Sequence, residues 1–243
     1  MRVDPTMKQA MIFAAGMGTR LKPLTDVIPK ALVPVGDKPL LQIVLERLLD
    51  ADIRNVVVNA HHKSAQICNY LKLLQSYYDV QISISDESEQ LLETGGGIRK
   101  AQGLFDASAP VLIHNVDILS NVDLAAFYDN IGDADAMLLV SERKTKRYLL
   151  FDDDLRLQGW TNIETGELRG RVGERRLAFS GIHVLWPSIF PLLEQMPERF
   201  PIMDFYLKVC ADCLIRGYEQ KDLRLLDVGK LDTLDQANEF ITK

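Results

Sequence analysis

Short apolar runs alternate with amphipathic segments along the first 140 residues. Apolar runs typical of buried strands begin at Met11 and span 56–58, 111–114 and 136–140, and alternating apolar and polar residues predict another strand over 80–84. Apolar residues at helical spacing predict helices over 40–49, 61–74 and 124–131, with one more opening at Thr94. This alternation favours an α/β fold with a Rossmann-like, mixed but mostly parallel sheet flanked by helices, because parallel neighbours require a crossover.

The pattern changes after residue 140. Short β runs with polar turns between them, at 148–151, 155–160 and 177–185, predict antiparallel strands that form a small lid or subdomain over 142–186. The remaining periodicity predicts helices over 188–195, 203–216 and 233–241 and a late strand over 223–226. No clear linker interrupts the chain, so we expect a single domain over residues 1–243, with 1–6 as a flexible extension before Met7.

Composition excludes several classes of function. The net charge is −6 and no basic face is evident, which argues against a nucleic-acid binder. No apolar run approaches the roughly 20 residues of a membrane span, and the polar N-terminus lacks a secretory signal. The three cysteines are too few for a disulfide scaffold and suit a reducing compartment. We therefore expect a cytoplasmic protein without a membrane or nucleic-acid partner, as a monomer or a homodimer.

The pair Cys210 and Cys213 has the Cys-x-x-Cys spacing of some zinc and redox sites. A second pair and a nearby histidine are both missing, and the two residues fall in a predicted amphipathic helix. Packing is the favoured interpretation.

A tight loop follows the first apolar run. Gly16 and Gly18 let the main chain turn without a side chain in the way, so backbone N–H groups can approach a phosphate closely. Arg20 then supplies a planar cation suited to phosphate oxygens. The alternative is a structural turn with a surface arginine. The Walker and dinucleotide-binding spacings are both absent, since Leu21 stands where the latter needs a third glycine.

Two aspartates follow apolar strands at other points of the chain. Asp117 ends the segment Asn115-Val116-Asp117, and Asp227 follows the late strand. Ligands of parallel α/β sheets bind at the carboxyl ends of strands. Two carboxylates placed together there repel unless a cation lies between them, and Mg²⁺ takes carboxylates together with substrate phosphates. The alternative for either residue alone is a strand-end cap.

The segment from Glu93 to Gly97 is the remaining marker. Three consecutive glycines at a helix start are expected to leave backbone N–H groups free and close to a ligand. A plain flexible loop is the alternative.

In these motifs the chain resembles the sugar-1-phosphate nucleotidyltransferases. Residues 16–25 match their Gly-x-Gly-Thr-Arg-Leu-x-Pro-Leu-Thr loop, and residues 29–32 match the Pro-Lys-Ala/Pro-Leu block that follows it. Within that family the likeness is greatest to the short bacterial N-acetylmuramate-1-phosphate uridylyltransferases, and it covers nearly the whole chain.

The resemblance implies the fold of nucleotide-diphospho-sugar transferases and a set of site residues. It implies catalytic roles for Arg20, Lys30, Asp117 and Asp227, with the two aspartates holding Mg²⁺. It places the sugar phosphate substrate near Ser180 and Gly181, and Arg147 of a basic cluster over 143–147 is a further expected contact of that substrate. Nucleotide-binding residues by the same resemblance are Ala14, Ala15, Gly16, Gly18, Thr19, Glu93, Thr94, Gly95, Gly96 and Asn115. Val116 departs from the family, which usually has glycine there.

The implied reaction joins a nucleoside triphosphate to a sugar 1-phosphate and releases pyrophosphate. UTP with a muramate-like N-acetyl amino-sugar is the expected pair, and the basic cluster Arg143, Lys144, Lys146 and Arg147 offers a cation for the lactyl carboxylate. Alternatives are a mannose- or heptose-1-phosphate guanylyltransferase and a choline-phosphate cytidylyltransferase, for which Trp160 and Trp186 would supply the pocket. A glycosyltransferase and a non-catalytic nucleotide-binding protein are less favoured, because a tight Asp-x-Asp pair is absent and the charged residues are all present.

Overall fold

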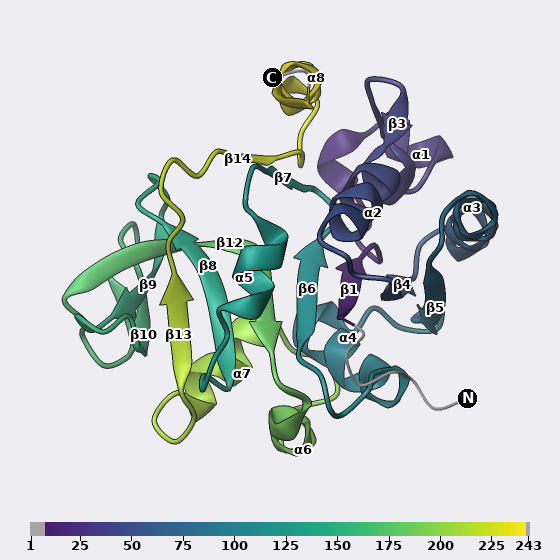
Figure 1. The fold of residues 1–243 in the computed structure, drawn as a ribbon. Coiled ribbons are helices and arrows are strands. Elements are labelled where there is room, and N and C mark those ends of the chain that lie inside the picture. Colours follow the sequence, from purple (N-terminus) through teal and green to yellow (C-terminus); the bar gives the residue numbers. More distant parts are fainter. Residues whose placement is uncertain (1–7, 242–243) are drawn as a thin grey trace.

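A ten-stranded sheet organises the part of the chain that the computed structural model describes, residues 8–241; the expected extension at 1–6 lies outside these residues. Its main path runs β11-β10-β9-β12-β6-β1-β4-β5, while β8 pairs with β12 and β13 pairs with β8 (Figure 1). The strands are β1 (Gln9–Phe13), β4 (Asn55–Ala60), β5 (Gln81–Asp86), β6 (Val111–Asn115), β8 (Ala136–Ser141), β9 (Arg147–Phe151), β10 (Leu157–Asn162), β11 (Glu167–Gly170), β12 (Arg175–Leu185) and β13 (Ile215–Tyr218).

The sheet is mixed, as the sequence predicted. β6, β1, β4 and β5 are mutually parallel neighbours, and β13 runs parallel to β8. β12 is antiparallel to both β6 and β8 and lies between them. The fifth predicted strand, β8, therefore has the direction of the parallel set but is separated from it by one antiparallel strand. The predicted fold class, a mixed sheet flanked by helices, is confirmed.

The antiparallel strands predicted over 148–185 are also present, as β9, β10, β11 and β12. They extend the main sheet through β12. The first residues of this long strand, Arg175 to Leu177, pair with β9, and its last four, Ile182 to Leu185, pair with β6. That this segment acts as a lid stays a prediction.

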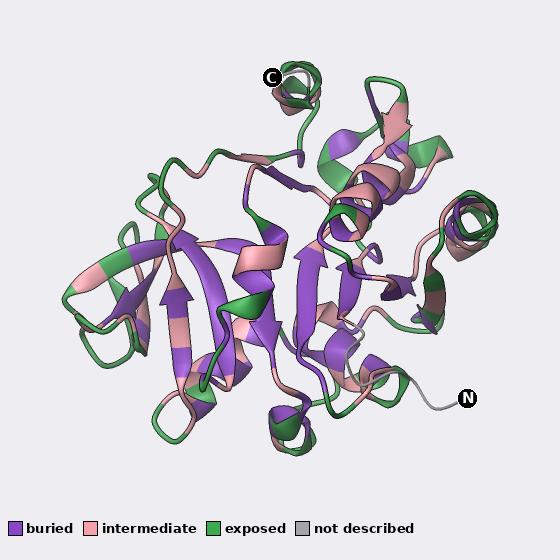
Figure 2. Ribbon diagram, in the orientation of Figure 1, coloured by how far each residue is buried: buried purple, intermediate pink, exposed green. Residues whose placement is uncertain are grey.

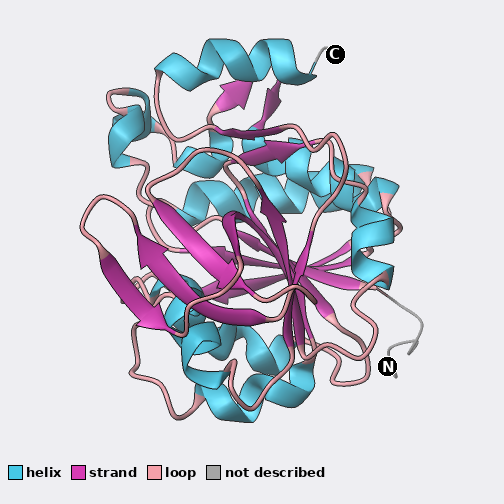
Figure 3. Ribbon diagram, turned by 90° about the vertical axis from the view of Figure 1, so that its left-hand side faces the viewer, coloured by secondary structure: helices cyan, strands magenta, loops and turns pink. Residues whose placement is uncertain are grey.

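Helices cover both faces of the sheet (Figure 3). Their apolar sides pack on two separate cores, because alternate residues of a strand point to opposite faces. In β1, Ala10 and Ile12 belong to one core and Met11 to the other. The strands are accordingly buried over most of their length (Figure 2). The helices are α1 (Leu24–Val27), α2 (Leu40–Asp50), α3 (Ser64–Tyr77), α4 (Glu93–Ala101), α5 (Leu124–Asp129), α6 (Phe190–Leu193), α7 (Ile202–Val209) and α8 (Asp232–Ile241), with 3-10 turns η1 (Thr19–Leu21), η2 (Lys30–Leu32), η3 (Gln102–Leu104) and η4 (Pro187–Ile189).

The helix predicted over 203–216 is wrong in its second half. α7 ends at Val209, and the chain returns as β13 along β8. Gly217 fits this strand because a Cβ there would lie 3.2 Å from both Phe151 and Val140. Cys210 and Cys213 lie in the turn between helix and strand and pack against the core, which supports the packing interpretation. Similarly, the helix predicted over 188–195 is a 3-10 turn followed by the short α6.

Two small ribbons complete the fold. β2 (Pro34–Val35) pairs with β3 (Lys38–Pro39), and β7 (Ile118–Ser120) pairs antiparallel with β14 (Leu225–Asp227). The late strand predicted over 223–226 therefore belongs to this second ribbon and not to the main sheet. Across residues 8–241 the structure has no helix that is both long and apolar enough to span a membrane.

Candidate active site

A cavity of about 350 Å³ opens at the carboxyl ends of β1, β4 and β6. This edge is where parallel α/β sheets bind their ligands. Seven of the residues predicted for the site line it: Ala15, Gly16, Lys30, Glu93, Thr94, Asn115 and Asp117. The other lining residues are Phe13, Asn59, Glu87, Leu91, Val116 and Pro201.

The backbone of the glycine loop is only partly available to a ligand. The N–H groups of Ala14 and Ala15 both donate to Oδ1 of Asn59, at 2.7 and 3.2 Å. These two N–H groups are thus engaged within the protein, and a role of Ala14 and Ala15 in nucleotide binding stays a prediction. Gly16 differs, because a Cβ placed there would meet no atom within 4 Å, so its backbone faces open space.

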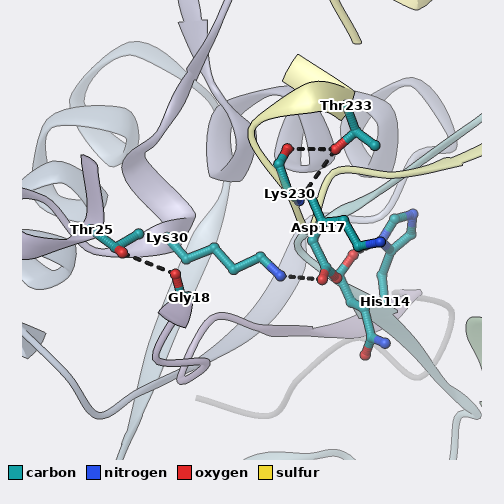
Figure 4. Close-up of polar contacts among 8 residues, drawn as sticks. Gly18, Thr25, Lys30, His114, Asp117, Lys230 and Thr233 are labelled. Carbon is teal, nitrogen blue, oxygen red and sulfur yellow. Dashed lines mark hydrogen bonds and ion pairs between the residues drawn. The ribbon is translucent and has the colours of Figure 1, made fainter. Parts of the chain in front are cut away.

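Gly18 supports the loop from within. It has a positive φ of 62°, and a Cβ there would lie 2.8 Å from the methyl group of Thr25 and 2.9 Å from Cβ of Lys30. The Thr25 hydroxyl donates to the Gly18 carbonyl at 2.9 Å (Figure 4). Glycine is needed here both for the backbone conformation and for the close approach of these two side chains. The contact fixes the root of the Lys30 side chain.

Lys30 reaches across the cavity to Asp117. Its ammonium forms an ion pair with Oδ2 of Asp117 (Figure 4), and the side chains are 11% and 19% exposed. The lysine starts in η2 and the aspartate follows β6, so the ion pair joins two segments 87 residues apart. The structure thus brings two predicted catalytic residues into direct contact.

Asp227 approaches from the β7–β14 ribbon. It pairs in register with Ile118, and the Val228 N–H donates to the Asp117 carbonyl at 2.8 Å. Although Asp227 is solvent-exposed, partial burial of its carboxyl group and the nearby Asp117 charge raise its pKa, against the opposing effects of Lys30, Arg20 and Arg143. The two aspartates are near enough for their charges to interact, and an antiparallel ribbon, not a pair of neighbouring parallel strands, brings their segments together.

Arg20 lies against the turn that follows Asp227. A Cβ on Gly229 would lie 2.9 Å from the Arg20 guanidinium and 2.7 Å from Oδ1 of Asp227. The absence of a side chain at Gly229 therefore lets the arginine approach the carboxylate. Thr19 lies beside it in the same exposed 3-10 turn, outside the cavity lining.

The donor set fits a divalent cation that is shared with a ligand. Two carboxylates whose charges repel each other are suited to Mg²⁺, which prefers oxygen ligands and completes its shell with water and phosphate. Within residues 8–241 there is no cluster of three or more histidine, cysteine, aspartate or glutamate side chains that would hold a metal by itself. Such a site needs oxygens from a bound phosphate.

The glycine run of α4 serves packing. The N–H groups of Gly95 and Gly96 both donate to the Phe200 carbonyl, at 2.9 and 3.3 Å. The prediction that the N–H groups of this glycine run are free is therefore wrong for these two residues. A side chain at Gly95 would collide with the Phe200 ring, and one at Gly96 would lie 2.6 Å from the Glu198 carbonyl oxygen. These glycines allow the 198–201 segment to pack directly on the helix.

Glu93 and Thr94 line the cavity but their side chains are already engaged. A carboxylate oxygen of Glu93 accepts from Arg199 at 2.9 Å, and the Thr94 hydroxyl accepts from the Ile202 N–H at 2.8 Å. The two contacts tie the start of α4 to the segment before α7 and to the first residue of α7. Their roles in nucleotide binding stay predictions.

Asn59, which was not among the predicted site residues, forms a buried network with Glu87. Asn59 Nδ2 donates to Oε1 of Glu87 at 2.7 Å, and the Leu92 N–H donates to Oε2 at 3.2 Å. The two side chains are 1% and 0% exposed. Asn59 thus joins the glycine loop to the 87–92 loop. The available signal was an asparagine ending a strand of valines, which suggests a polar group at the sheet edge.

Replacing Asn59 with alanine is expected to lower the free energy of unfolding by about 2–4 kcal/mol. Two backbone N–H groups and Oε1 of the buried Glu87 carboxylate lose the partner that Asn59 provides. The glycine loop also loses its anchor, so the Kd for nucleotide rises. Urea unfolding and calorimetric titration measure the two effects, and an unchanged unfolding midpoint would contradict the proposed anchor.

A second cleft of about 520 Å³ lies beside the antiparallel strands. Arg143, Arg147, Arg169 and Trp160 line it, and Pro201 lines both this cleft and the first cavity. Arg143 donates to the Phe179 carbonyl at 2.8 Å and is close enough to Asp227 to affect its pKa. The two spaces are therefore neighbours at Pro201.

Ser180 and Gly181 lie behind the first cavity, where β12 is irregular. Gly181 has φ of 78°, and a Cβ there would lie 2.8 Å from Nδ2 of Asn115. Ser180 is 2% exposed, and its hydroxyl has no hydrogen-bond partner within residues 8–241. Gly181 thus supports the Asn115 side chain. Direct contact of either residue with a sugar phosphate stays a prediction.

Val116 and Trp186 belong mainly to the core. Val116 is buried in the core on the α2 side, and its N–H donates to the Phe13 carbonyl at 3.2 Å. Trp186 packs against the same core and does not line the second cleft, where Trp160 lies. The structure does not bring the two tryptophans together around one cleft.

Known proteins are similar to this chain in sequence and in architecture. The sequence model of the family described as nucleotidyl transferase matches residues 9–151. N-acetylmuramate alpha-1-phosphate uridylyltransferase of Caulobacter vibrioides is 32% identical over 228 residues, which cover 89% of this chain and 90% of that relative. The catalytic subunit beta of mannose-1-phosphate guanylyltransferase of Drosophila pseudoobscura pseudoobscura is 27% identical over 246 residues, which cover 96% of this chain and 61% of that relative.

A solved structure shares the fold. UDP-glucose pyrophosphorylase from Acinetobacter baumannii superposes with a TM-score of 0.79 at 20% identity, over 96% of this chain and 92% of that one. The architecture thus extends over nearly the whole chain.

Proposed function

This chain belongs to the nucleotidyl transferase family, as a sugar-1-phosphate nucleotidyltransferase, and we propose that it joins UTP to a muramate-like N-acetyl amino-sugar 1-phosphate with the help of Mg²⁺. The sugar phosphate oxygen forms a bond to the α-phosphorus while the bond to the leaving pyrophosphate breaks. The products are a UDP-sugar and pyrophosphate.

One observation carries the assignment of the site: Lys30, Asp117, Asp227 and Arg20 converge beside a cavity at the carboxyl end of the sheet. Both reactants are anions, so catalysis depends on positioning and on neutralising charge. Lys30 and Arg20 offset the charge of the triphosphate and of the departing pyrophosphate. Asp117 and Asp227 would hold the metal, which supplies a Lewis acid for the α-phosphate.

Relatives favour the uridylyl reaction. The chain spans nine-tenths of the Caulobacter uridylyltransferase but about three-fifths of the Drosophila guanylyltransferase. The second cleft fits the acceptor, because it adjoins the first cavity at Pro201. Arg147 is exposed there without an ion-pair partner among the described residues, so it is available for a lactyl carboxylate. Trp160 offers an apolar wall for the sugar ring.

Guanylyl transfer to mannose 1-phosphate is the second candidate, favoured by the 27% identity to the mannose-1-phosphate guanylyltransferase. The choline-phosphate alternative loses support because the two tryptophans do not share a cleft. The second cleft also carries several arginines, which suit an anionic group better than a quaternary ammonium.

Pyrophosphate release is expected to be fastest with UTP and N-acetylmuramate 1-phosphate in a matrix of four triphosphates and several sugar phosphates. Within that matrix, Arg147→Ala should raise KM for the muramate substrate about tenfold or more but leave KM for N-acetylglucosamine 1-phosphate unchanged, because only the former has the carboxylate. Arg171→Ala, an exposed arginine outside this cleft, is the control. A preference for GTP with mannose 1-phosphate would overturn the base and sugar assignment and leave the reaction type intact.

A further inference from the structure

In the proposed reaction Lys30 can bind two partners, the Asp117 carboxylate and the phosphates of the nucleotide, and in this structure it binds the carboxylate. Its ammonium pairs with Oδ2 of Asp117, and both side chains are mostly buried. Figure 4 shows the side chain extended across the cavity to the carboxylate. The Cβ of Lys30 packs closely against Gly18, so a change of partner is expected to come from the outer part of the side chain.

The same carboxylate is one of the two oxygen donors that fit a divalent cation. An ammonium and a metal ion on one carboxylate repel each other, since both are positive and only a few ångströms apart. Lys30 therefore competes with a metal for Asp117. Removing the lysine charge leaves Asp117 and Asp227 as an uncompensated pair, which binds a cation more strongly.

We propose that Lys30 is an exchangeable counter-ion that holds the aspartate pair closed to free divalent cations and moves to the phosphates when the metal arrives on a nucleotide. The movement of Lys30 to the phosphates rests on the proposed function, whereas its competition with a metal for Asp117 does not. Lys30 and Gly16 line the same cavity as Asp117, so a phosphate on the glycine loop is within reach of the ammonium after rotation of its side chain.

The charge balance supports this order of events. Around Asp227, the second aspartate adds a negative charge while Lys30, Arg20 and Arg143 offset it. A free divalent cation entering this group meets three positive side chains and two negative ones. A metal that carries a triphosphate brings a net negative charge, so it satisfies the lysine and the arginines together.

The test measures metal binding without any substrate. Mn²⁺ titration, followed by electron paramagnetic resonance, is compared among the wild type, Lys30→Met, Lys30→Arg and Lys22→Met. Lys30→Met is expected to bind Mn²⁺ about tenfold more tightly than the wild type, because a close positive charge is gone. Lys30→Arg keeps the charge and should keep the weak affinity. Lys22 pairs with Asp26 on the surface and serves as the matched control.

Adding Asp227→Asn to Lys30→Met should abolish the tight site, which places the metal on the aspartate pair. Circular dichroism establishes that each variant is folded at the temperature of titration. Equal or weaker Mn²⁺ affinity in folded Lys30→Met would overturn the counter-ion role, and so would tight binding that survives Asp227→Asn. Pyrophosphate release by the wild type is recorded separately. Its absence would refute the proposed function, and the metal titration would still give its own result.

Discussion

Asp227→Asn is expected to reduce kcat at least about 10³-fold while the protein remains fully folded. The carboxylate lies on the β7–β14 ribbon directly beside the Asp117 segment, so its loss removes one of the two charged oxygen donors proposed for Mg²⁺. Asparagine keeps the size and one oxygen of the side chain but not the charge. Steady-state pyrophosphate release with saturating Mg²⁺ measures the effect.

The thermal stability of this variant should be equal to or slightly above that of the wild type without metal. The pKa of Asp227 is raised by burial and by Asp117, which means that folding disfavours the ionised form at pH 7. Removing the charge therefore removes a repulsion. Asp117→Asn should lose as much activity but lower the Tm, because Lys30 is left buried without its partner.

Asp222→Asn is the control for both variants. It makes the same chemical change on the same segment, five residues before Asp227, at an exposed position with positive φ that asparagine tolerates. Its activity should be that of the wild type. Near-normal turnover in folded Asp227→Asn or Asp117→Asn would remove the basis for placing a metal on these residues.

The central fold was predictable because its signals are local. Valine-rich runs such as β4 are buried on both faces and have few alternatives to a parallel strand. β13 was missed because its four residues follow α7 after a short turn, and such a short apolar run is compatible with continued helical periodicity. The strand conformation of β13 depends on its pairing with β8, which lies about 80 residues earlier in the chain and leaves no local signal.

The candidate site was predictable as a set of residues but not as an arrangement. Motif spacing selected Lys30, Asp117 and Asp227, yet the pairing of β7 with β14 that unites the aspartates depends on contacts more than 100 residues apart. The glycines of α4 show the opposite case. A glycine run suits both ligand binding and close packing, and here the Phe200 carbonyl occupies two of the N–H groups. The sequence contains no local signal that distinguishes ligand binding from close packing at these glycines.

Asn59 illustrates a third limit. Its side chain accepts from two N–H groups of the glycine loop and donates to Glu87, so it shapes the site from behind. An asparagine at a strand end predicts a polar contact of some kind. The identity of the partners follows only from the parallel pairing of β1 with β4, which places Phe13 beside Asn59.

Arg20→Ala is expected to lower kcat/KM about 10³-fold, whereas Lys22→Ala should have little effect. Arg20 lies against Gly229 beside Asp227, and among the described residues it has no ion-pair partner, so its guanidinium is available to phosphate oxygens. Lys22 is two residues away in the same loop, but it is exposed and already pairs with Asp26 at 3.0 Å. The loss should appear in kcat as well as in KM, because the role proposed for the arginine is to stabilise charge that develops on the leaving pyrophosphate.

Gly229→Ala provides an independent test of the same contact. A methyl group at this position would lie 2.9 Å from the Arg20 guanidinium and 2.7 Å from Oδ1 of Asp227, so one of the two must move. We expect a reduced kcat with both charged residues still present, and no further loss when Arg20→Ala is added, since the two changes disrupt one arrangement. Equal and mild effects of Arg20→Ala and Lys22→Ala would show that Arg20 does not act at this position, and unchanged turnover in folded Gly229→Ala would contradict the close contact.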